Sequence, residues 1–464
     1  MKSPFFGHVL IFLMISLSRF PHVTASLRRL GTNLTSVTFI GDLHADVGCA
    51  KEWVQKTGLV NVTSTPYKWL GDPENDALVF LGDYVDKGSS SASVLQFVRS
   101  LQETFPDNIL TILGNHDFFL ILDTALSFSK DNPHPLGFPF YDYAYSFMHP
   151  EEYLESEWVE TRTDDEDIYG VLMTALQNTY AKRMEGSVHL CAPECNSEEQ
   201  VNIFETIAPF KTNPELAKKT QDRLGTWRSE YAKGLFDSGL LRWMTNQPLV
   251  AVVGDALIVH GGVSKQVVNY MSSLSTHFDI DVAEALQTHI NEQFQKFFES
   301  NLNNVTGPNM IKGRMTAGYL TELILDLVQH RGYFDRKSGC SDVNHVISTV
   351  NSEELPIKRV VVGHTPNSYA RELCGGKLLA SDSSLSRSFR AYGNMYCPLS
   401  SERAAQYAKG ASCGATPEDF CDGSISRMTR PSANDPWPTK MERYLLEELT
   451  PLSELVMDEL LEEL

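Results

Sequence analysis

Five short blocks of aspartate, histidine, asparagine and glycine hold the side chains of this sequence best suited to chemistry. In chain order they are Gly41-Asp42-Leu43-His44, Gly82-Asp83-Tyr84-Val85-Asp86-Lys87-Gly88, Gly114-Asn115-His116-Asp117, His260-Gly261-Gly262 and Gly363-His364-Thr365-Pro366. Carboxylate, imidazole and amide donors in this combination are suited to a site with two metal ions that cleaves phosphoesters.

Each block follows or ends an apolar, β-branched run. The runs are Val37 to Ile40, Ala77 to Leu81, Ile109 to Leu113, Ala256 to Val259 and Arg359 to Val362. Runs of this length predict buried strands. Because open sheets place their sites at strand ends, the blocks are expected to meet at one edge.

Hydrolysis of a phosphate monoester needs a hydroxide at the phosphorus, compensation of the phosphoryl charge, and a proton for the leaving oxygen. Two metal ions about 4 Å apart meet the first two needs. Asp83 is the natural bridge between them. The six expected ligands are Asp42, His44, Asp83, Asn115, His260 and His364. All are nitrogen or oxygen donors, which favours manganese, iron or zinc and leaves the choice among them open.

His116 directly follows the expected ligand Asn115 and is the candidate general acid for the leaving oxygen. Asp86 lies three residues after Asp83 and can pair with His116, fixing its tautomer. Most single histidines have a structural role, but here the block gives His116 a catalytic one.

Composition limits the possible partners. The chain has 464 residues, 42% of them hydrophobic, and a net charge of −20. This suits a globular fold with a sizeable core. The negative charge argues against a nucleic acid as partner, because a phosphate backbone calls for a basic surface.

The N-terminus predicts a secretory signal peptide, residues 1–25, with a basic Lys2, an apolar run from Val9 to Leu17, and small residues before a cleavage site after Ala25. The alternative is an uncleaved anchor, which the short run disfavours. No other segment is apolar enough to span a membrane. Glycosylation sequons at Asn33, Asn61 and Asn304 are consistent with a secreted or endomembrane-lumenal glycoprotein.

Eight cysteines behind a signal peptide favour disulfides. Cys191 and Cys195 can close a small loop, or less plausibly contribute to a zinc site. Four others, between Cys374 and Cys421, are placed to link the C-terminal loops, although the pairing cannot be derived.

The strand-rich blocks fall in two segments, 26–117 and 241–426, which together form the expected catalytic domain. Between them lies an insertion, 118–240, expected to be mainly helical. It is either a surface subdomain or, slightly favoured, a cap over the site. Residues 427–464 are expected to be a proline-containing linker and an acidic amphipathic helix, docked on the body or binding a partner.

The five blocks resemble those of the calcineurin-like metallophosphoesterases, and more narrowly the bacterial-type, Shewanella-like branch of the phosphoprotein phosphatases. The resemblance implies an α/β (α+β) fold, a four-layer αββα sandwich with the metals at its edge. It implies that Asp83 is shared between one metal held with Asp42 and His44, and another held with Asn115, His260 and His364. His116 with Asp86 matches the acid pair, and Arg331 matches a phosphate-binding arginine.

Three positions depart from the family pattern. Ala45 replaces a glycine, Asp117 replaces the usual glutamate, which is expected to weaken a supporting ion pair, and Lys87 replaces a phosphate-clamping arginine. Lysine keeps the charge but loses the bidentate fork, so weaker phosphate binding is expected.

The resulting hypothesis is a metal-dependent protein phosphatase in the secretory pathway, in which a metal-bridged hydroxide attacks a phosphoserine, phosphothreonine or phosphotyrosine. One alternative keeps the chemistry but takes nucleotides or other small phosphoesters. Another, less favoured because none of the six ligands is lost, is a non-catalytic binding protein.

Overall fold

The computed structural model describes the parts of the chain that carry the five blocks, except Lys87 and Gly88 of the second block. These are Leu34 and residues 36–86, 90–127, 156–161, 168–170, 213–278, 280–292, 294–295, 318–353, 355–366, 370–382 and 426–429. The predicted signal peptide, the Cys191–Cys195 pair and the acidic tail lie outside them.

The first sheet has four strands in the order β11-β1-β4-β5. Strands β1 (Ser36–Ile40), β4 (Asp76–Phe80) and β5 (Ile109–Thr111) are parallel. The predicted apolar runs therefore do form strands. The edge of the sheet beyond β1 is covered by β11 (Ser426–Thr429), which pairs antiparallel with β1.

Two helices connect these strands and cover one face of the sheet. Helix α2 (Val47–Lys56) begins at Asp46, whose side chain accepts a hydrogen bond from the backbone of Cys49 at 3.0 Å and caps the helix. Helix α3 (Ser91–Thr104) buries Val94, Val98 and Leu101 along one side, as a helical spacing of apolar residues predicts. The short strands β2 (Val60–Asn61) and β3 (Lys68–Trp69) form a hairpin beside α2.

The second sheet has the order β6-β7-β8-β10-β9. The predicted hairpin is present: β6 (Val250–Val253) and β7 (Ala256–Val259) are joined by a two-residue turn in which Gly254 has a φ of 59°. Strand β8 (Arg359–Val362) runs parallel to β7 and to β10 (Leu378–Ala380), and β9 (Arg371–Leu373) forms the edge.

The outer face of the second sheet carries the helices of the second segment. They are α11 (Lys265–Phe278), α12 (Val282–Glu284), the π-helix η2 (Ala285–Ile290), α15 (Gly318–Gln329), the 3-10 helix η3 (Gly332–Phe334) and α16 (Gly339–Val350). Helix α16 contacts β8 and α11, and η2 contacts β6. A disulfide joins Cys340 in α16 to Cys374 beside β9, so disulfide formation is confirmed for this pair.

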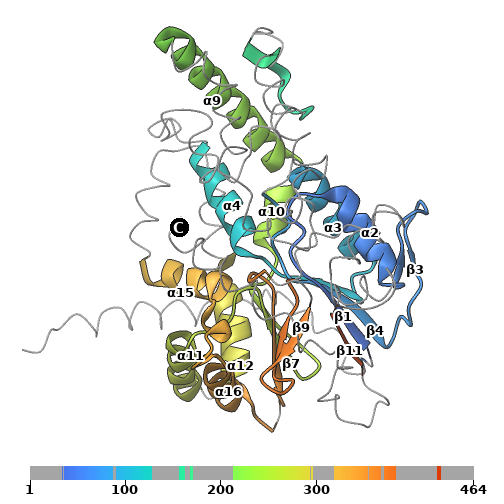
Figure 1. Cartoon of the computed structure of the whole chain (residues 1–464), viewed down its shortest axis with the longest axis vertical. Helices are drawn as coiled ribbons and strands as arrows, with labels where there is room; N and C mark the ends of the chain where they lie inside the picture. Colours follow the sequence, from blue (N-terminus) through green and yellow to red (C-terminus); the bar gives the residue numbers. More distant parts are fainter. Residues whose placement is uncertain are drawn as a thin grey trace, which may run out of the picture.

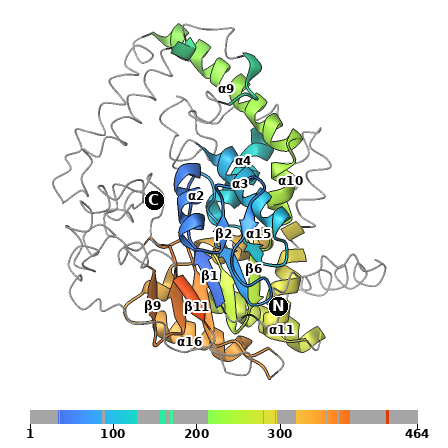
Figure 2. The same cartoon turned by 90° about the vertical axis from the view of Figure 1, so that its right-hand side faces the viewer.

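An apolar layer lies between the two sheets. It takes alternate residues from the strands, among them Val37 and Phe39 of β1, Ala251 and Val253 of β6, and Val361 of β8. Because side chains of a strand alternate between its faces, the remaining strand residues pack under the helices. The layers therefore run helix, sheet, sheet, helix (Figures 1 and 2), which is the predicted αββα metallophosphoesterase fold.

The described part of the insertion is mostly helical. Helix α4 (Asn115–Ser127) continues from the third block into the insertion, and α9 (Pro214–Asp237) and α10 (Leu240–Thr245) lead back out of it. Helix α9 projects away from the sheets (Figure 1). Aromatic side chains hold it, with Trp158 5.6 Å from Tyr231 between ring centroids. Whether the insertion caps the site stays a prediction.

The start of the predicted linker is corrected by β11. Residues 427–429, expected to be linker, are paired with β1 in the register Ser36 to Thr429. The prolines that suggested a linker begin only at Pro431. Among the described residues, no helix has the length and apolar character needed to cross a bilayer.

Candidate metal centre

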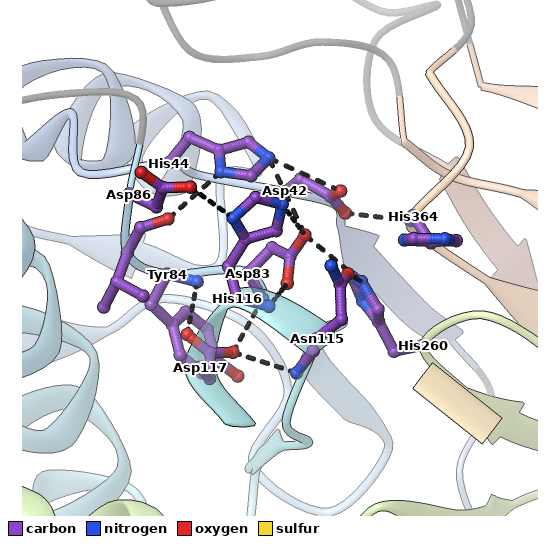
Figure 3. Close-up of polar contacts among 12 residues, drawn as sticks. Asp42, His44, Asp83, Tyr84, Asp86, Asn115, His116, Asp117, His260 and His364 are labelled. Atoms are coloured by element: carbon purple, nitrogen blue, oxygen red, sulfur yellow. Dashed lines mark hydrogen bonds and ion pairs between the residues drawn. The ribbon is translucent and has the colours of Figure 1, made fainter. Parts of the chain in front are cut away.

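All six expected ligands lie at the carboxyl ends of strands. Asp42 and His44 follow β1, Asp83 follows β4 and Asn115 follows β5, while His260 follows β7 and His364 follows β8. Because β1, β4 and β5 are parallel, and β7 and β8 are also parallel, their ends meet at one edge of the sandwich. Figure 3 shows the six side chains around Asp83.

The backbone at this edge is unusually contorted. His44, Asp83, Asp86 and His364 have φ angles of 38°, 53°, 70° and 65°, in the left-handed region that side chains other than glycine rarely adopt. The strands also approach closely: a Cβ on Gly114 would lie 2.1 Å from Oδ1 of Asp83. The glycine of the third block is therefore needed for the Asp83 carboxylate to fit.

His44 presents one nitrogen to the carboxylates. Its Nδ1 donates to the carbonyl of Val85 at 3.1 Å, which leaves Nε2 available to bind a metal. That nitrogen lies 3.8 Å from Oδ2 of Asp42 and 3.7 Å from Oδ2 of Asp83. These separations are too long for direct hydrogen bonds and leave space between the three groups.

His260 is oriented in the same way. Its Nδ1 donates to the carbonyl of Leu81 at 2.6 Å, and its Nε2 lies 3.3 Å from Oδ2 of Asp83 and 3.2 Å from Oδ1 of Asn115. His364 faces His260, with ring centroids 5.2 Å apart. Burial, then His260 and Arg331, hold the pKa of His364 well below its usual value, so its imidazole is neutral and able to bind a metal.

The donor groups fit two metal ions that share Asp83. Possible ligand atoms lie within 4.8 Å of one another in two groups, one of His44, Asp83 and His116 and the other of Asp83, His260 and His364. Two buried polar atoms of these candidate ligands, Oδ2 of Asp42 and Nε2 of His364, have no hydrogen-bond partner. A buried polar atom without a partner costs free energy unless something such as a cation satisfies it.

The electrostatics also call for cations. Burial, then the nearby carboxylates of Asp382 and Asp83, raises the pKa of Asp42 well above its usual value. Burial works in the same direction on Asp83, but His260, His116 and His44 outweigh it and hold the pKa of Asp83 well below its usual value. A bound divalent ion would relieve the repulsion between these buried carboxylates.

The predicted acid pair is brought together. Nδ1 of His116 donates to Oδ2 of Asp86 at 2.5 Å, and Nε2 of His116 lies 3.8 Å from Oδ2 of Asp83. The backbone N–H of His116 donates to Oδ1 of Asp83 at 2.9 Å. His116 thus has one ring nitrogen held by a carboxylate and the other directed at the candidate metal centre (Figure 3).

Asp117 has a role that the sequence did not reveal. Expected to form a weakened ion pair, it instead accepts hydrogen bonds from the backbone N–H groups of Asp83 at 2.7 Å, Tyr84 at 2.9 Å and Gly114 at 2.9 Å. Its side chain is fully buried. Burial, then repulsion from Asp83, raises its pKa to about 7. Asp117 therefore ties the end of β4 to the end of β5.

Asp382 was also missed. It is fully buried just after β10, close enough to Asp42 for its charge to raise the pKa of that carboxyl. The signal was present, since Leu378 to Ala380 is a short apolar run followed by an acid, the pattern of the first two blocks.

Of the two expected phosphate-binding residues, Arg331 is the one that the structure describes. Its Nη1 lies 3.4 Å from both the carbonyl of His364 and the hydroxyl of Thr365. This places its exposed guanidinium beside the candidate metal centre. Lys87 lies outside the described residues.

Comparison with known proteins shows which families this chain resembles. The family model "Calcineurin-like phosphoesterase" matches residues 35–183. Shewanella-like protein phosphatase 2 of Arabidopsis thaliana is 21% identical over 355 residues, covering 75% of this chain and 71% of that protein. The predicted resemblance is thus confirmed.

Shorter matches involve nucleotide-cleaving enzymes. The symmetrical bis(5′-nucleosyl)-tetraphosphatase of Buchnera aphidicola is 37% identical over 86 residues, 18% of this chain and 25% of the enzyme. That of Yersinia pestis is 35% identical over 98 residues, 21% of this chain and 28% of the enzyme. Among solved structures, the cold-active protein-tyrosine phosphatase of a psychrophilic Shewanella aligns over 81% of this chain and 80% of its own, with 15% identity and a TM-score of 0.40.

Proposed function

We propose that this chain, a calcineurin-like metallophosphoesterase by its fold and motifs, is a metal-dependent phosphatase that acts on phosphoproteins. The observation that carries the proposal is the His116–Asp86 pair, 2.5 Å apart, directed at donor groups that share Asp83. An acid beside a two-metal donor set is what cleavage of a phosphate monoester requires.

The ligand residues divide between two metal ions. Asp42, His44 and Asp83 would hold one, and Asp83, Asn115, His260 and His364 the other. When bound, such ions lower the pKa of water and offset the charge of the phosphoryl oxygens. The nitrogen and oxygen donors suit manganese, iron or zinc.

The protein groups would then handle the leaving oxygen and the phosphate. His116 gives the proton on Nε2 to the side-chain oxygen that leaves, while Asp86 stabilises the protonated ring through Nδ1. Arg331, beside His364, can form two hydrogen bonds to the phosphoryl oxygens. Lys87 would add a second positive charge.

The similarity to a Shewanella-like protein phosphatase over 75% of this chain supports a phosphoprotein substrate. The second candidate, a hydrolase of nucleotides or other small phosphoesters, is supported by the tetraphosphatase matches, which span only about a quarter of those enzymes. A non-catalytic role is disfavoured because all six ligand residues are in place.

Entry into the secretory pathway is part of the proposal. The disulfide between Cys340 and Cys374 supports it, since such bonds form and persist in oxidising compartments. Asn61, at the end of β2, is the sequon asparagine that falls within the described residues, and glycosylation there would be consistent with secretion.

The test is phosphate release by residues 26–464 loaded with Mn²⁺. The substrates are p-nitrophenyl phosphate, a phosphoserine peptide, a phosphotyrosine peptide and diadenosine tetraphosphate, with Asp83→Asn as control. Release from either peptide that disappears in the control would support the proposal, and the ratio of the two peptides would give the preference. Cleavage of the dinucleotide alone would favour the second candidate.

A further inference from the structure

The segment that carries Arg331 is packed tightly against the loop that follows the ligand His260. The backbone N–H groups of Gly261 and Gly262 donate to the carbonyl of Leu327 at 2.9 and 3.1 Å. Leu327 lies in the last turn of α15, where carbonyls lack partners within the helix. The ligand loop therefore supplies the missing donors for the end of this helix.

On the other side of Arg331, Tyr333 fixes the same loop. The hydroxyl of Tyr333 accepts from the backbone N–H of Val263 at 2.9 Å and donates to the carbonyl of Val263 at 2.8 Å. Tyr333 is almost fully buried, so these bonds are shielded from water. Arg331 thus lies between two points of attachment to the loop after His260.

The two glycines of the fourth block make this approach possible. A Cβ on Gly261 would lie 2.6 Å from the backbone nitrogen of His330, and one on Gly262 would lie 2.8 Å from Cδ2 of its ring. Such distances are not tolerated, so any side chain here would push away the segment that begins at His330.

The side chain of Asp326 contacts both the loop after His260 and the segment that carries Arg331. Its Oδ2 accepts a hydrogen bond from the hydroxyl of Ser264, on the ligand loop. Its Oδ1 lies 3.7 Å from Nδ1 of His330, the residue before Arg331. The ring of His330 is in turn held edge-on against Tyr333, with centroids 4.9 Å apart. One carboxylate therefore contacts both the loop after His260 and the residue that precedes Arg331.

We propose that Asp326 is a positioning residue for phosphate binding: by holding Ser264 and His330, it directs Arg331 toward His364 and the phosphate. The inference rests on the proposed function in that it takes Arg331 to bind phosphate. Arg331 directly follows His330 and precedes η3, so a shift of the His330 backbone would move the Arg331 side chain from its position 3.4 Å from the carbonyl of His364.

The test is a double-mutant cycle on Asp326→Ala and Arg331→Ala, read as the Kd of Mn²⁺-loaded protein for inorganic phosphate by calorimetry. Arg331→Ala should weaken phosphate binding about 10- to 100-fold, the loss expected for hydrogen bonds to a charged group. Asp326→Ala should weaken it less, by up to about 10-fold, as for other residues that orient a binding group. The double variant should bind as weakly as Arg331→Ala alone.

Controls separate positioning from folding. Asp342→Ala removes a carboxylate of α16 whose Oδ1 lies 2.6 Å from Nζ of Lys265. This control should leave phosphate affinity at the wild-type value. Elemental analysis should find unchanged metal content in every variant, and Asp326→Asn is a milder change should Asp326→Ala fold poorly.

Three results overturn the proposal. Additive weakening in the double variant, or wild-type affinity in both Asp326→Ala and Asp326→Asn, would show that Asp326 does not act through Arg331. Wild-type affinity in Arg331→Ala would show that Arg331 does not bind phosphate, so that there is no group for Asp326 to position. Since phosphate binding is measured without a substrate, absence of phosphatase activity in the wild-type protein would reject the proposed function separately.

Discussion

Replacing Asp117 by asparagine tests how the bridging carboxylate is held. In the native protein Oδ2 accepts from the N–H groups of Asp83 and Gly114, and Oδ1 accepts from that of Tyr84. Asparagine can place its carbonyl oxygen where Oδ2 lies, which keeps two of the bonds. Its amide nitrogen then faces the N–H of Tyr84, so two donors oppose each other.

The cost follows from that one lost bond. A buried N–H without a partner reduces stability by about 1–3 kcal/mol. Because Tyr84 directly follows Asp83, a shift of the Tyr84 backbone also displaces Asp83. Affinity for the metal ions that Asp83 would bind should then fall about 10-fold, as when other residues that orient a ligand are lost. Asp117→Asn should therefore lower metal affinity. Its effect on the urea midpoint should be smaller than the lost bond alone implies, because the substitution also removes a carboxylate whose charge is disfavoured by burial and by Asp83.

The assay is urea unfolding of metal-free protein at pH 8, above the pKa of about 7 that burial and Asp83 impose on Asp117, so that the native carboxylate is ionised. Metal affinity is measured by calorimetry with Mn²⁺. Asp72→Asn is the matched control, because Asp72 also accepts a backbone N–H, from Glu74 at 2.9 Å, but is exposed. An Asp117→Asn protein with wild-type metal affinity would refute this account of Asp117.

Three further changes give distinct results. His116→Asn should lower kcat about 10²- to 10⁴-fold with metal content unchanged, and near-normal turnover would remove His116 from the reaction. Asp83→Asn should leave less than one equivalent of metal by elemental analysis, since both donor groups share Asp83; full occupancy would argue against a bridge. Ala45→Gly should raise the free energy of unfolding by about 1 kcal/mol or less, because Ala45 has a φ of 52° in the left-handed region. A drop in the urea midpoint would contradict that reading.

Local patterns in the sequence predict the strands well, and they correctly place the six candidate ligands at strand ends. Val37 to Ile40 and Arg359 to Val362 are strands because β-branched residues buried on both faces suit a covered sheet. The turn at Gly254 and Asp255 follows from spacing alone, while the meeting of Asp86 with His116 follows once β4 and β5 are neighbours.

Contacts between distant segments explain what could not be predicted. The sequence suggested that Asp117 pairs with a cation. Instead it accepts hydrogen bonds from N–H groups that follow β4 and β5, and these groups converge only when the sheet forms. Asp382 lies far from Asp42 in sequence, and only the pairing of β10 with β8 brings it there. Residues 427–429 have no strong strand signal, and β1 provides the edge that makes them a strand.

The pairing of β11 with β1 also bears on how the protein is made. A chain synthesised from its N-terminus completes Asp42, His44 and Asp83 early, yet the outer edge of β1 stays open until residues 426–429 have left the ribosome. His260 and His364 are also synthesised long after Asp42, His44 and Asp83. The nascent chain therefore carries an unfinished sheet and only part of the candidate ligand set until these later segments have been made. Protection of that sheet edge from other chains comes only after all six candidate ligands have been synthesised.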